Sequence, residues 1–595
     1  MSSSTVWLLL KAIPVVVALS LVIFTYEREL VPLYGSGPTN YLLNKIGFVS
    51  AFLSSIQPFS VHISYSLFLT AIALTIAPNA TYWTAVWTSH MGHPLWGPAI
   101  AHVTVLAPLV SLLIGVLGWP NSKFTVALPT RALTGAAVYS LSYNLHRRVW
   151  APSSLFYDVS DSNIYLNVAL LTWGAFILTL SFSKSQPAPT SKKTRPQKAG
   201  FTDRQIKGVL LSAFAAVWRT VQPHLVNPVL PHPLPEVFTH PSYPLQILSA
   251  EQSVTGLITV GQWLPPPKDS DSTDQLHSAR YLRASHSVLG GVWTHDKVQK
   301  LDDDKPLEDI YGAPLGDSIY STFVIQEAAR LVNSTKASKA GKVDNALVIG
   351  LGIGTSATSF MRHGINTTIV EIDPAVYRAA RTWFALPDPG PNNVYLEDAR
   401  SWALQKKLSI DAGNKEPLYD IVVHDCFSGG GVPEHIYTFE FWNDLKSSMQ
   451  KEGIIAVNFA GVLSSLSSRL VVSTLEKAFG QCRAFHDMFD EFPEEKYATE
   501  FINMVIFCSQ SPAPLTFRNS KRSDWLGSPL RRHVLQSLND REVNLSLIRE
   551  TPGDERYIIT DNNNPLGPLQ EQQGAHHWEG ESSLLRSTSH HDSHF

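Results

Sequence analysis

Long apolar runs dominate the first 182 residues and predict membrane-spanning helices, because a helix needs roughly 20 mostly apolar residues to cross hydrocarbon. Three runs have this length and lie at 6–25, 97–118 and 163–182. A fourth run, at 61–77, is shorter, and two further runs, at 46–56 and 132–145, are marginal. We therefore expect four to six transmembrane helices. The first should be uncleaved, because no basic segment precedes it and no small-residue cleavage site follows it.

Charge is distributed unevenly along the chain. Only 11 of the first 182 residues are charged, whereas 86 of the remaining 413 are. A linker at 183–200 carries five basic residues and no acidic one, and basic flanks stay on the cytosolic side during insertion. We therefore expect residues 183–595 to face the cytosol. The three cysteines, Cys426, Cys482 and Cys508, are too few for a disulfide framework and suggest a reducing compartment.

Beyond the linker, short continuous apolar runs alternate with helical patterns over 344–570. The expected strands are 345–350, 367–372, 419–424 and 453–459, and the expected helices are 356–363, 375–384 and 439–450. Such strands indicate a parallel sheet with helices on both faces. The sequence therefore predicts a doubly wound, Rossmann-like α/β domain over 344–570. An amphipathic helix and the first part of a catalytic region should occupy 201–343, and a polar, His-containing tail 571–595.

Ligands of such sheets bind beyond the carboxyl ends of the strands, so the residues there are candidates for chemistry. The first strand runs into a loop with Gly350, Gly352 and Gly354. Glycines allow sharp turns and close approach of a ligand, and the helix that follows offers free N–H groups. A tight structural turn is a serious alternative. The second strand ends in Glu371, whose carboxylate can accept both hydroxyls of a ribose, whereas Asp373 precedes a proline and is expected to cap a helix.

The next two strand ends add further acids. A third strand end, between the strands at 367–372 and 419–424, gives Glu397, Asp398 and Ala399, where an acidic side chain can accept the exocyclic amine of adenine. The fourth, after the strand at 419–424, gives Asp425. Four such ends in succession are harder to obtain by chance than any one of them. The loop is GxGxG rather than GxGxxG and does not provide for a pyrophosphate. The sequence therefore favours an S-adenosyl cofactor over NAD.

Three segments, LVIGLGIGTS, TTIVEIDPAV and VVHDCFSGGGVPEHIYTFEFW, resemble the spermidine synthase (polyamine aminopropyltransferase) family. The third is similar to the branch whose catalytic domain is joined to membrane helices. The resemblance covers about 317–509 and implies a methyltransferase-like Rossmann fold. It implies that Asp425 accepts a proton from an amine as decarboxylated S-adenosylmethionine gives up its aminopropyl group. It also implies that Gln326 contacts the cofactor.

The chain departs from the family pattern at four positions. Ser428 and Gly430 stand where soluble and membrane-linked members, respectively, carry a second acid, Ile353 stands for the acid of the glycine loop, and Ile325 stands for a tyrosine. Each change removes a group that could bind an ammonium. The resemblance therefore supports the cofactor pocket better than the acceptor pocket.

Three functions are consistent with these residues. The first is a membrane-anchored, aminopropyltransferase-like enzyme acting on a small-molecule amine. The second is a methyltransferase that uses intact S-adenosylmethionine on a small or membrane-derived acceptor. The third is a non-catalytic polyamine or nucleoside sensor. A net charge of −3 gives no reason to expect nucleic acid as a partner, and no metal site is expected. The oligomeric state stays open, a homo-oligomer included.

Overall fold

The computed structural model describes residues 3–56, 62–117, 128–181, 203–222, 229–266, 277–298, 305–333, 343–427, 431–488, 492–549 and 554–570. The linker at 183–200, Ser428, Gly430 and the tail at 571–595 lie outside these ranges. The chain divides into two units. Met1–Leu33 and Thr39–Leu230 form the helical unit, and Tyr34–Pro38 and Pro231–Asp592 form the α/β unit.

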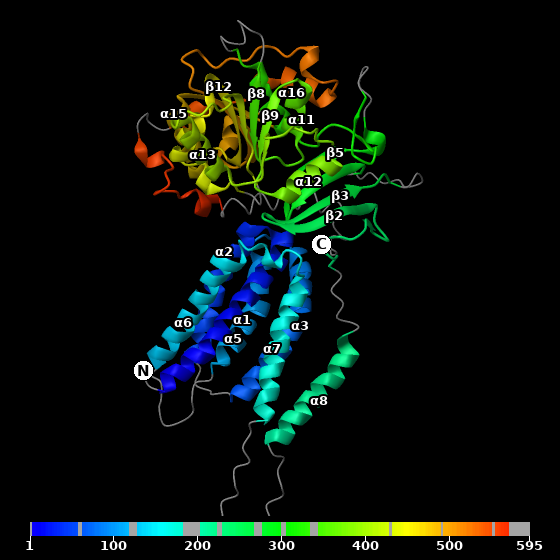
Figure 1. Ribbon diagram of the computed structural model, residues 1–595, viewed down its shortest axis with the longest axis vertical. Coiled ribbons are helices and arrows are strands. Elements are labelled where there is room, and N and C mark those ends of the chain that lie inside the picture. The colour runs from blue at the N-terminus through cyan, green and yellow to red at the C-terminus, as the bar shows by residue number, and fades with distance from the viewer. Residues whose placement is uncertain are drawn as a thin grey trace, which may run out of the picture. The chain divides into compact units, whose positions relative to one another are not determined.

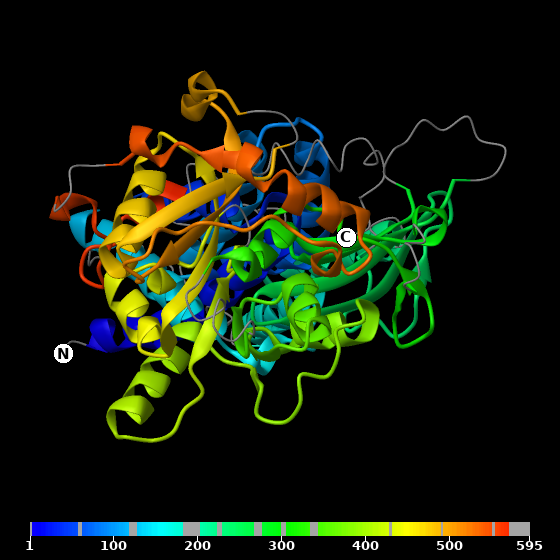
Figure 2. The same cartoon turned by 90° about the horizontal axis from the view of Figure 1, so that it is seen from above.

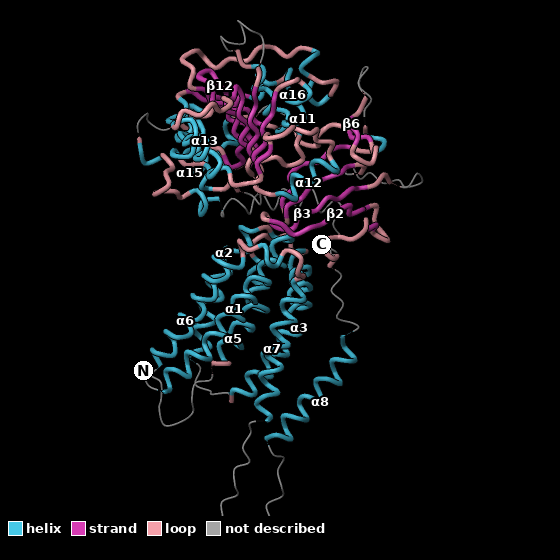
Figure 3. The backbone as a smooth tube through the Cα atoms, in the orientation of Figure 1, coloured by secondary structure: helices cyan, strands magenta, loops and turns pink. Residues whose placement is uncertain are grey.

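The described part of the helical unit contains helices and no strand (Figure 3). Helices occur at all six predicted apolar runs, and several are longer than the runs. Their bounds are α1 Ser3–Tyr34, α2 Ser36–Ile56, α3 Ile63–Ser89, α4 Trp96–Ala101 continuing through a π-helical turn into α5 Ala107–Gly115, α6 Leu128–Leu145, α7 Asp161–Ser181 and α8 Asp203–Val221. Among the described residues, three helices are long and apolar enough to cross a membrane: Ile63–Ser89, Trp96–Gly115 and Asp161–Thr179.

Helix α8 was expected in the catalytic region but groups with the helical unit. Its residues Leu210, Leu211 and Phe214 pack against a cluster formed by α3 and α7. The rings of Phe214 and Trp173 are 4.9 Å apart. The buried ammonium of Lys207 donates a hydrogen bond to Ser64 Oγ at 3.0 Å. The boundary between the two units therefore follows α8 rather than the basic linker.

An eight-stranded sheet forms the centre of the α/β unit (Figure 1). Its strands, in spatial order, are β10 Val394–Tyr395, β9 Asn366–Val370, β8 Asn345–Ile349, β11 Tyr419–His424, β12 Met449–Val462, β14 Phe501–Ser509, β13 Gln481–His486 and β15 Glu542–Val543. The first five are parallel, as expected for the four of them that were predicted, β9, β8, β11 and β12; β10 was not among the expected strands. The sheet as a whole is mixed, because β14 is antiparallel to both β12 and β13, and β15 is antiparallel to β13.

Helices cover both faces of this sheet, as expected for a doubly wound fold (Figure 2). One core cluster includes α9 Thr322–Gln326, α11 Thr355–Arg362, α12 Pro374–Trp383 and α16 Pro529–Gln536, and the other includes α13 Ala399–Asp411, α14 Phe439–Lys446 and α15 Leu466–Phe479. The predicted helix 439–450 is too long. It ends at Lys446 because Met449 already pairs with Tyr419 as the first residue of β12.

A separate five-stranded antiparallel sheet precedes this domain and was not predicted. Its strands are β1 Phe238–Thr239, β2 Leu245–Ser253, β3 Gly256–Trp263, β4 Ala279–Ala284 and β5 Ser287–Trp293. A two-stranded ribbon follows, formed by β6 Leu307–Glu308 and β7 Pro314–Leu315. Ile258, Val260 and Leu282 of the five-stranded sheet belong to the same core cluster as α11 and α12. The region at 231–333 is therefore part of the α/β unit.

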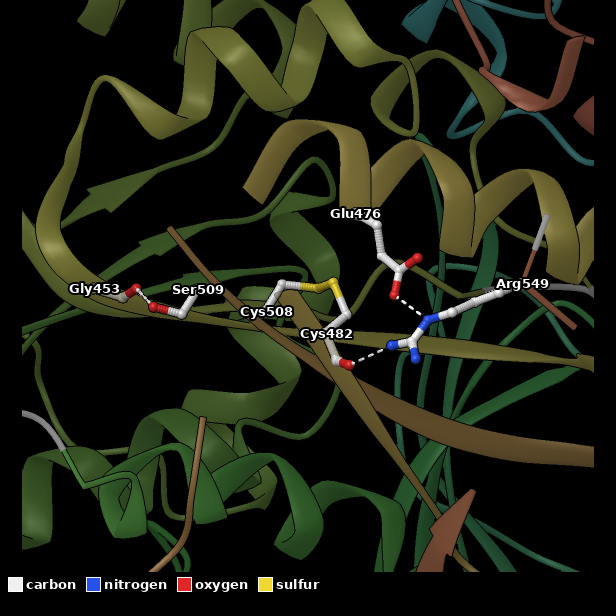
Figure 4. Close-up of a disulfide and its surroundings, with 6 residues drawn as sticks. All are labelled: Gly453, Glu476, Cys482, Cys508, Ser509 and Arg549. Carbon is white, nitrogen blue, oxygen red and sulfur yellow. Dashed lines mark hydrogen bonds and ion pairs between the residues drawn. A yellow bond between two sulfur atoms is a disulfide. The ribbon is translucent and has the colours of Figure 1, made fainter. Parts of the chain in front are cut away.

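Two of the three cysteines form a disulfide, so the interpretation that all three are unpaired is wrong (Figure 4). Cys482 of β13 lies directly opposite Cys508 of β14, and their Cα atoms are 4.2 Å apart. Arg549 donates to the carbonyl oxygen of Cys482 and to Glu476 of α15 beside this bond. Cys426 is the one free cysteine in the described part of the chain.

Candidate active site

A cavity of about 800 Å³ lies at the carboxyl edge of the parallel strands. Its volume is within the usual range for a site that encloses a small ligand. Six of the eight predicted site residues line it: Gly350, Gly352, Glu371, Asp398, Ala399 and Asp425. Gln326 and Gly354 do not line it: Gln326 is hydrogen-bonded to Asp425, and Gly354 lies at the start of α11. The alternation of strands and helices thus brings the predicted residues together, as expected for ligand sites in such sheets.

The glycine loop is shaped by contacts within the protein as much as by space for a ligand. Gly350 has φ +80°, and a Cβ there would lie 2.1 Å from the carbonyl oxygen of Asp425. Gly352 has φ +53°, and its Cβ would lie 2.6 Å from the carbonyl oxygen of Leu289. Gly354 begins α11 with φ +81°. The structural interpretation of these glycines is therefore correct, and it also explains how the Asp425 backbone can reach the loop.

Glu371 is buried at the end of β9 and holds the glycine loop in place. Its Oε2 accepts the N–H of Leu351 at 2.7 Å, and its Oε1 accepts the N–H of Asp373 at 2.8 Å. Burial raises the pKa of this carboxyl to about 7, although the backbone N–H groups act in the opposite direction. Each carboxylate oxygen can accept more than one hydrogen bond. The side chain lines the cavity with lone pairs to spare, so it fits the predicted role of binding ribose hydroxyls.

The two neighbouring aspartates act as helix caps. Asp373 accepts the N–H of Ala375 at 2.8 Å, which confirms the predicted cap at the start of α12. Asp398 caps α13 by accepting the N–H groups of Arg400 and Ser401. Its second oxygen lies 2.8 Å from Nε2 of His435. Asp398 therefore has protein partners on both oxygens, and adenine would have to share them.

Asp425 is held by two neutral amides. Gln326 Nε2 donates to its Oδ2 at 2.7 Å, and Asn458 Nδ2 donates to its Oδ1 at 2.8 Å. Ser356 Oγ donates to Gln326 Oε1 at 2.7 Å, which fixes the orientation of the glutamine. Burial raises the pKa of Asp425, and the two amides oppose that shift. Gln326 thus positions Asp425 and does not face the cavity itself.

The amide of Asn458 leaves one acceptor available beside Asp425. Its nitrogen faces the carboxylate, and its Oδ1 is buried with no hydrogen-bond partner among the described residues. Leaving a buried polar atom unpaired is costly. Asn458 also lines the cavity, so a ligand N–H group that reached this oxygen would satisfy it beside Asp425. Asn458 lies on β12 and was not recognised from the sequence.

Three residues next to the site show which groups it does not provide: an acid in the glycine loop, a tyrosine and a reactive thiol. Ile353, which replaces the loop acid, is buried in the apolar core, and Gly290 of β5 leaves room for its side chain. Ile325, which replaces the tyrosine, is fully buried in the same core. Burial raises the pKa of the Cys426 thiol well above its usual value, so this cysteine is protonated at neutral pH and unsuited to be a nucleophile.

One carboxylate of the cavity, Asp487, was not predicted from the sequence. It follows β13, lines the cavity and accepts a hydrogen bond from Thr322 Oγ1 at 2.5 Å. The described lining also includes Glu371, Glu397, Asp398 and Asp425 but no lysine or arginine. The cavity is therefore suited to a cationic ligand. No cluster of three or more potential metal ligands occurs among the described residues.

Comparison with curated proteins finds two kinds of transferase. The chain is 34% identical over 340 residues to an N-terminal histidine N-methyltransferase of Emericella nidulans, covering 56% of this chain and 55% of that protein. It is 26% identical over 263 residues to a polyamine aminopropyltransferase of Vibrio vulnificus, covering 44% and 79%. The chain thus spans little more than half of the first relative. Comparison with protein-family models finds no match.

Among solved structures, a probable spermidine synthase from Corynebacterium glutamicum matches 48% of this chain and 87% of its own, at 17% identity and a TM-score of 0.31. Human methyltransferase-like protein 13, solved with S-adenosylhomocysteine, matches 36% and 91%, at 19% identity and a TM-score of 0.27. The relative with the higher sequence identity is a methyltransferase, the class that the sequence analysis ranked second. In sequence the chain is thus similar to transferases of both kinds, and the higher identity is to the methyltransferase.

Proposed function

We propose that this chain is an S-adenosylmethionine-dependent N-methyltransferase whose acceptor is the N-terminal histidine of a peptide or protein. The observation that carries the proposal is that the Asp425 carboxylate, bound by Asn458 Nδ2, and the unpartnered Asn458 Oδ1 lie side by side in an acidic cavity. These two groups accept hydrogen bonds from N–H donors, as a nitrogen nucleophile requires. The similarity to an N-terminal histidine N-methyltransferase supports this acceptor.

The chemistry asks little of the protein beyond alignment. The donor supplies a methyl group on a positively charged sulfur, and the acidic lining favours that charge. A neutral imidazole nitrogen attacks the methyl carbon as the carbon–sulfur bond breaks, and the ring then loses its other N–H proton. Asp425 can accept a hydrogen bond from that N–H, orient the ring and receive the proton. Gln326 and Asn458 keep the carboxylate in place during this step.

The test is methyl transfer by the full-length chain in detergent micelles. A peptide with an N-terminal histidine should gain the mass of one methyl group when S-adenosylmethionine is present. The same peptide with an alanine before the histidine is the control and should stay unchanged. Equal methylation of both peptides, or of neither, would contradict the proposed acceptor.

Aminopropyl transfer is the second candidate. An acidic cavity without lysine or arginine in its described lining also fits a polyamine, and the similarity to a polyamine aminopropyltransferase supports it. The same assay with decarboxylated S-adenosylmethionine and putrescine or spermidine distinguishes the two reactions. Binding of S-adenosylhomocysteine without any transfer would favour the sensor function.

We also propose that the helical unit lies in a membrane and that α8, which is less apolar than the three helices named above, crosses it packed against α3 and α7. The 19 residues of α8 span about 28 Å, close to the thickness of the hydrocarbon core. Ile206, Val209 and Val217 are 40–60% exposed and are not among the residues that pack against the cluster of α3 and α7. Such an apolar outer face suits lipid better than water. The charged residues other than Lys207 lie in the first and last turns of the helix.

This proposal changes the predicted orientation of the α/β unit. If the basic linker at 183–200 stays in the cytosol and α8 then crosses, the α/β unit lies on the opposite side of the membrane. The Cys482–Cys508 disulfide supports that orientation, because disulfides form and persist in oxidising compartments. The expectation that residues 183–595 face the cytosol is therefore retained only for the linker.

A further inference from the structure

The residues that line the cavity follow the order of the strands across the sheet. Asp398 and Glu371 follow β10 and β9, Gly350 follows β8, and Asp425 follows β11. Beyond Asp425 the lining continues with Asn458 on β12, Asn503 on β14 and Asp487 after β13. The predicted nucleoside residues occupy the β8–β10 side. The β12–β14–β13 side is therefore left for the acceptor.

Asp487 is the acidic group on that side. Its Oδ2 accepts the Thr322 hydroxyl at 2.5 Å, the side chain of Asn503 also donates to its carboxylate, and its own N–H donates to the Asn503 carbonyl oxygen at 3.3 Å. The nearby Arg541 guanidinium attracts Asp487 electrostatically but donates a hydrogen bond to the carbonyl oxygen of Met488 at 3.0 Å and not to the carboxylate. Thr322 and Asn503 are neutral, so they position the carboxylate without cancelling its charge.

Two other buried acids of the α/β unit, Glu327 and Asp524, are paired with arginines, whereas Glu371 is bound by backbone N–H groups. Glu327 accepts from Arg531 at 2.8 Å, and Asp524 accepts from Arg518 at 2.7 Å. A buried carboxylate is costly unless a cation or several hydrogen bonds compensate for the loss of water. Asp425 and Asp487 share one cavity and are hydrogen-bonded mainly by neutral groups. Both are thus available to a cation brought by the ligand.

We propose that Asp487 binds the protonated α-amino group of the acceptor's first residue, while Asp425 faces its imidazole. This inference rests on the proposed function and adds a requirement for a free N-terminus. At neutral pH the α-amino group, with an ordinary pKa near 7.7–8.0, is mostly a cation, whereas imidazole, with one near 6.5, is mostly neutral. The α-ammonium therefore suits a carboxylate partner, and the imidazole suits the role of nucleophile.

Equilibrium binding tests this inference without depending on turnover. The full-length chain, saturated with S-adenosylhomocysteine, is titrated with a peptide that begins with histidine and with the same peptide whose α-amino group is replaced by hydrogen. Wild type should bind the first peptide about 10- to 100-fold more tightly, as expected for one charged hydrogen-bond partner. Asp487→Asn should remove this preference and leave the affinity for the second peptide unchanged. Asp487→Glu keeps the charge and should retain part of the preference.

The control variant is Asp411→Asn, which removes an exposed carboxylate at the end of α13, outside the cavity. It should behave as wild type. Affinity for S-adenosylhomocysteine reports folding, and it should be equal in all variants. If Asp487→Asn weakens both peptides equally, or neither, the inference is overturned while the proposed function stands. Methyl transfer in the wild type decides the proposed function separately. If wild type binds neither peptide, the inference is overturned, and methyl transfer still decides the proposed function.

Discussion

Asn458 Nδ2 lies 2.8 Å from Asp425 Oδ1, so the amide of β12 turns its donor to the carboxylate and leaves its oxygen free. A carboxylate cannot donate this hydrogen bond unless it is protonated, so the orientation of the amide follows from its partner. Gln326 repeats the arrangement from the other side, with its own oxygen already occupied by Ser356. The result is one carboxylate with a fixed orientation and one free acceptor next to it.

The first prediction concerns the charge of Asp425. Asp425→Asn keeps the shape of the side chain but removes a proton acceptor, so turnover should fall by about 10²–10⁴-fold. S-adenosylhomocysteine affinity should change little, because Glu371 and the glycine loop lie on the nucleoside side. Methyl transfer and calorimetry on the same preparation measure both. Activity near that of wild type would mean that Asp425 only shapes the loop.

The second prediction concerns pH and Glu371. Because burial raises the pKa of Glu371 to about 7, the side chain is largely protonated at pH 6 and largely charged at pH 8. The charged form accepts hydroxyl hydrogens better, so nucleoside affinity should rise as pH increases through 7. The raised pKa has the opposite effect on folding, because the native state holds a proton that the unfolded chain releases near pH 4.5, so this group costs stability as pH rises.

Methylthioadenosine is the probe for this pH dependence, because it has a ribose but no amino acid part that titrates near neutrality. Its dissociation constant should decrease from pH 6 to pH 8 in the wild type. Glu371→Gln should remove that dependence and weaken binding by about 10- to 100-fold at pH 8, as expected for a lost charged acceptor worth about 1.5–3 kcal/mol. The same slope in wild type and variant would assign the titration to another group.

The sequence predicted the parallel half of the sheet and its acids because the signal there is local. The predicted strands contain continuous apolar runs, and Glu371 and Asp425 directly follow theirs. Asp487 follows β13 in the same way. It was missed because β13 reaches the cavity only through the order β12–β14–β13, and antiparallel pairing across the chain is not visible in a local pattern.

The same limit explains the two other omissions. Cys482 and Cys508 are 26 residues apart in the chain and meet only through the register of β13 with β14. The five-stranded sheet at 238–293 contains buried polar residues such as Arg280 and Gln262, which hydrogen-bond to each other, while Asp309 pairs with the charge of Arg280. Those polar residues interrupt the apolar pattern by which strands are recognised.

The third prediction concerns the orientation of the α/β unit. In sealed microsomes, protease should cut the basic linker at 183–200 and leave the α/β unit protected, because α8 separates the two. Cys482 and Cys508 should resist alkylation until a reductant is added. The exposed Asn544 lies in an Asn-Leu-Ser sequon, and a glycan there, absent from Asn544→Gln, would mark the same side. Digestion of the α/β unit in intact microsomes would restore the cytosolic orientation.

The fourth prediction separates backbone strain from the packing of the glycine loop. Gly350 and Gly364 both have positive φ, +80° and +72°. A Cβ at Gly364 meets nothing within 4 Å, whereas one at Gly350 lies 2.1 Å from the carbonyl oxygen of Asp425. Gly364→Ala should therefore cost only the left-handed conformation, about 1–2 kcal/mol of unfolding free energy, with nucleoside affinity unchanged. Gly350→Ala should cost more and should also displace Asp425, so turnover should fall in protein that remains folded. Denaturant unfolding, S-adenosylhomocysteine binding and methyl transfer measure the three effects. Equal losses in the two variants would mean that the close approach of Gly350 to Asp425 does not shape the site.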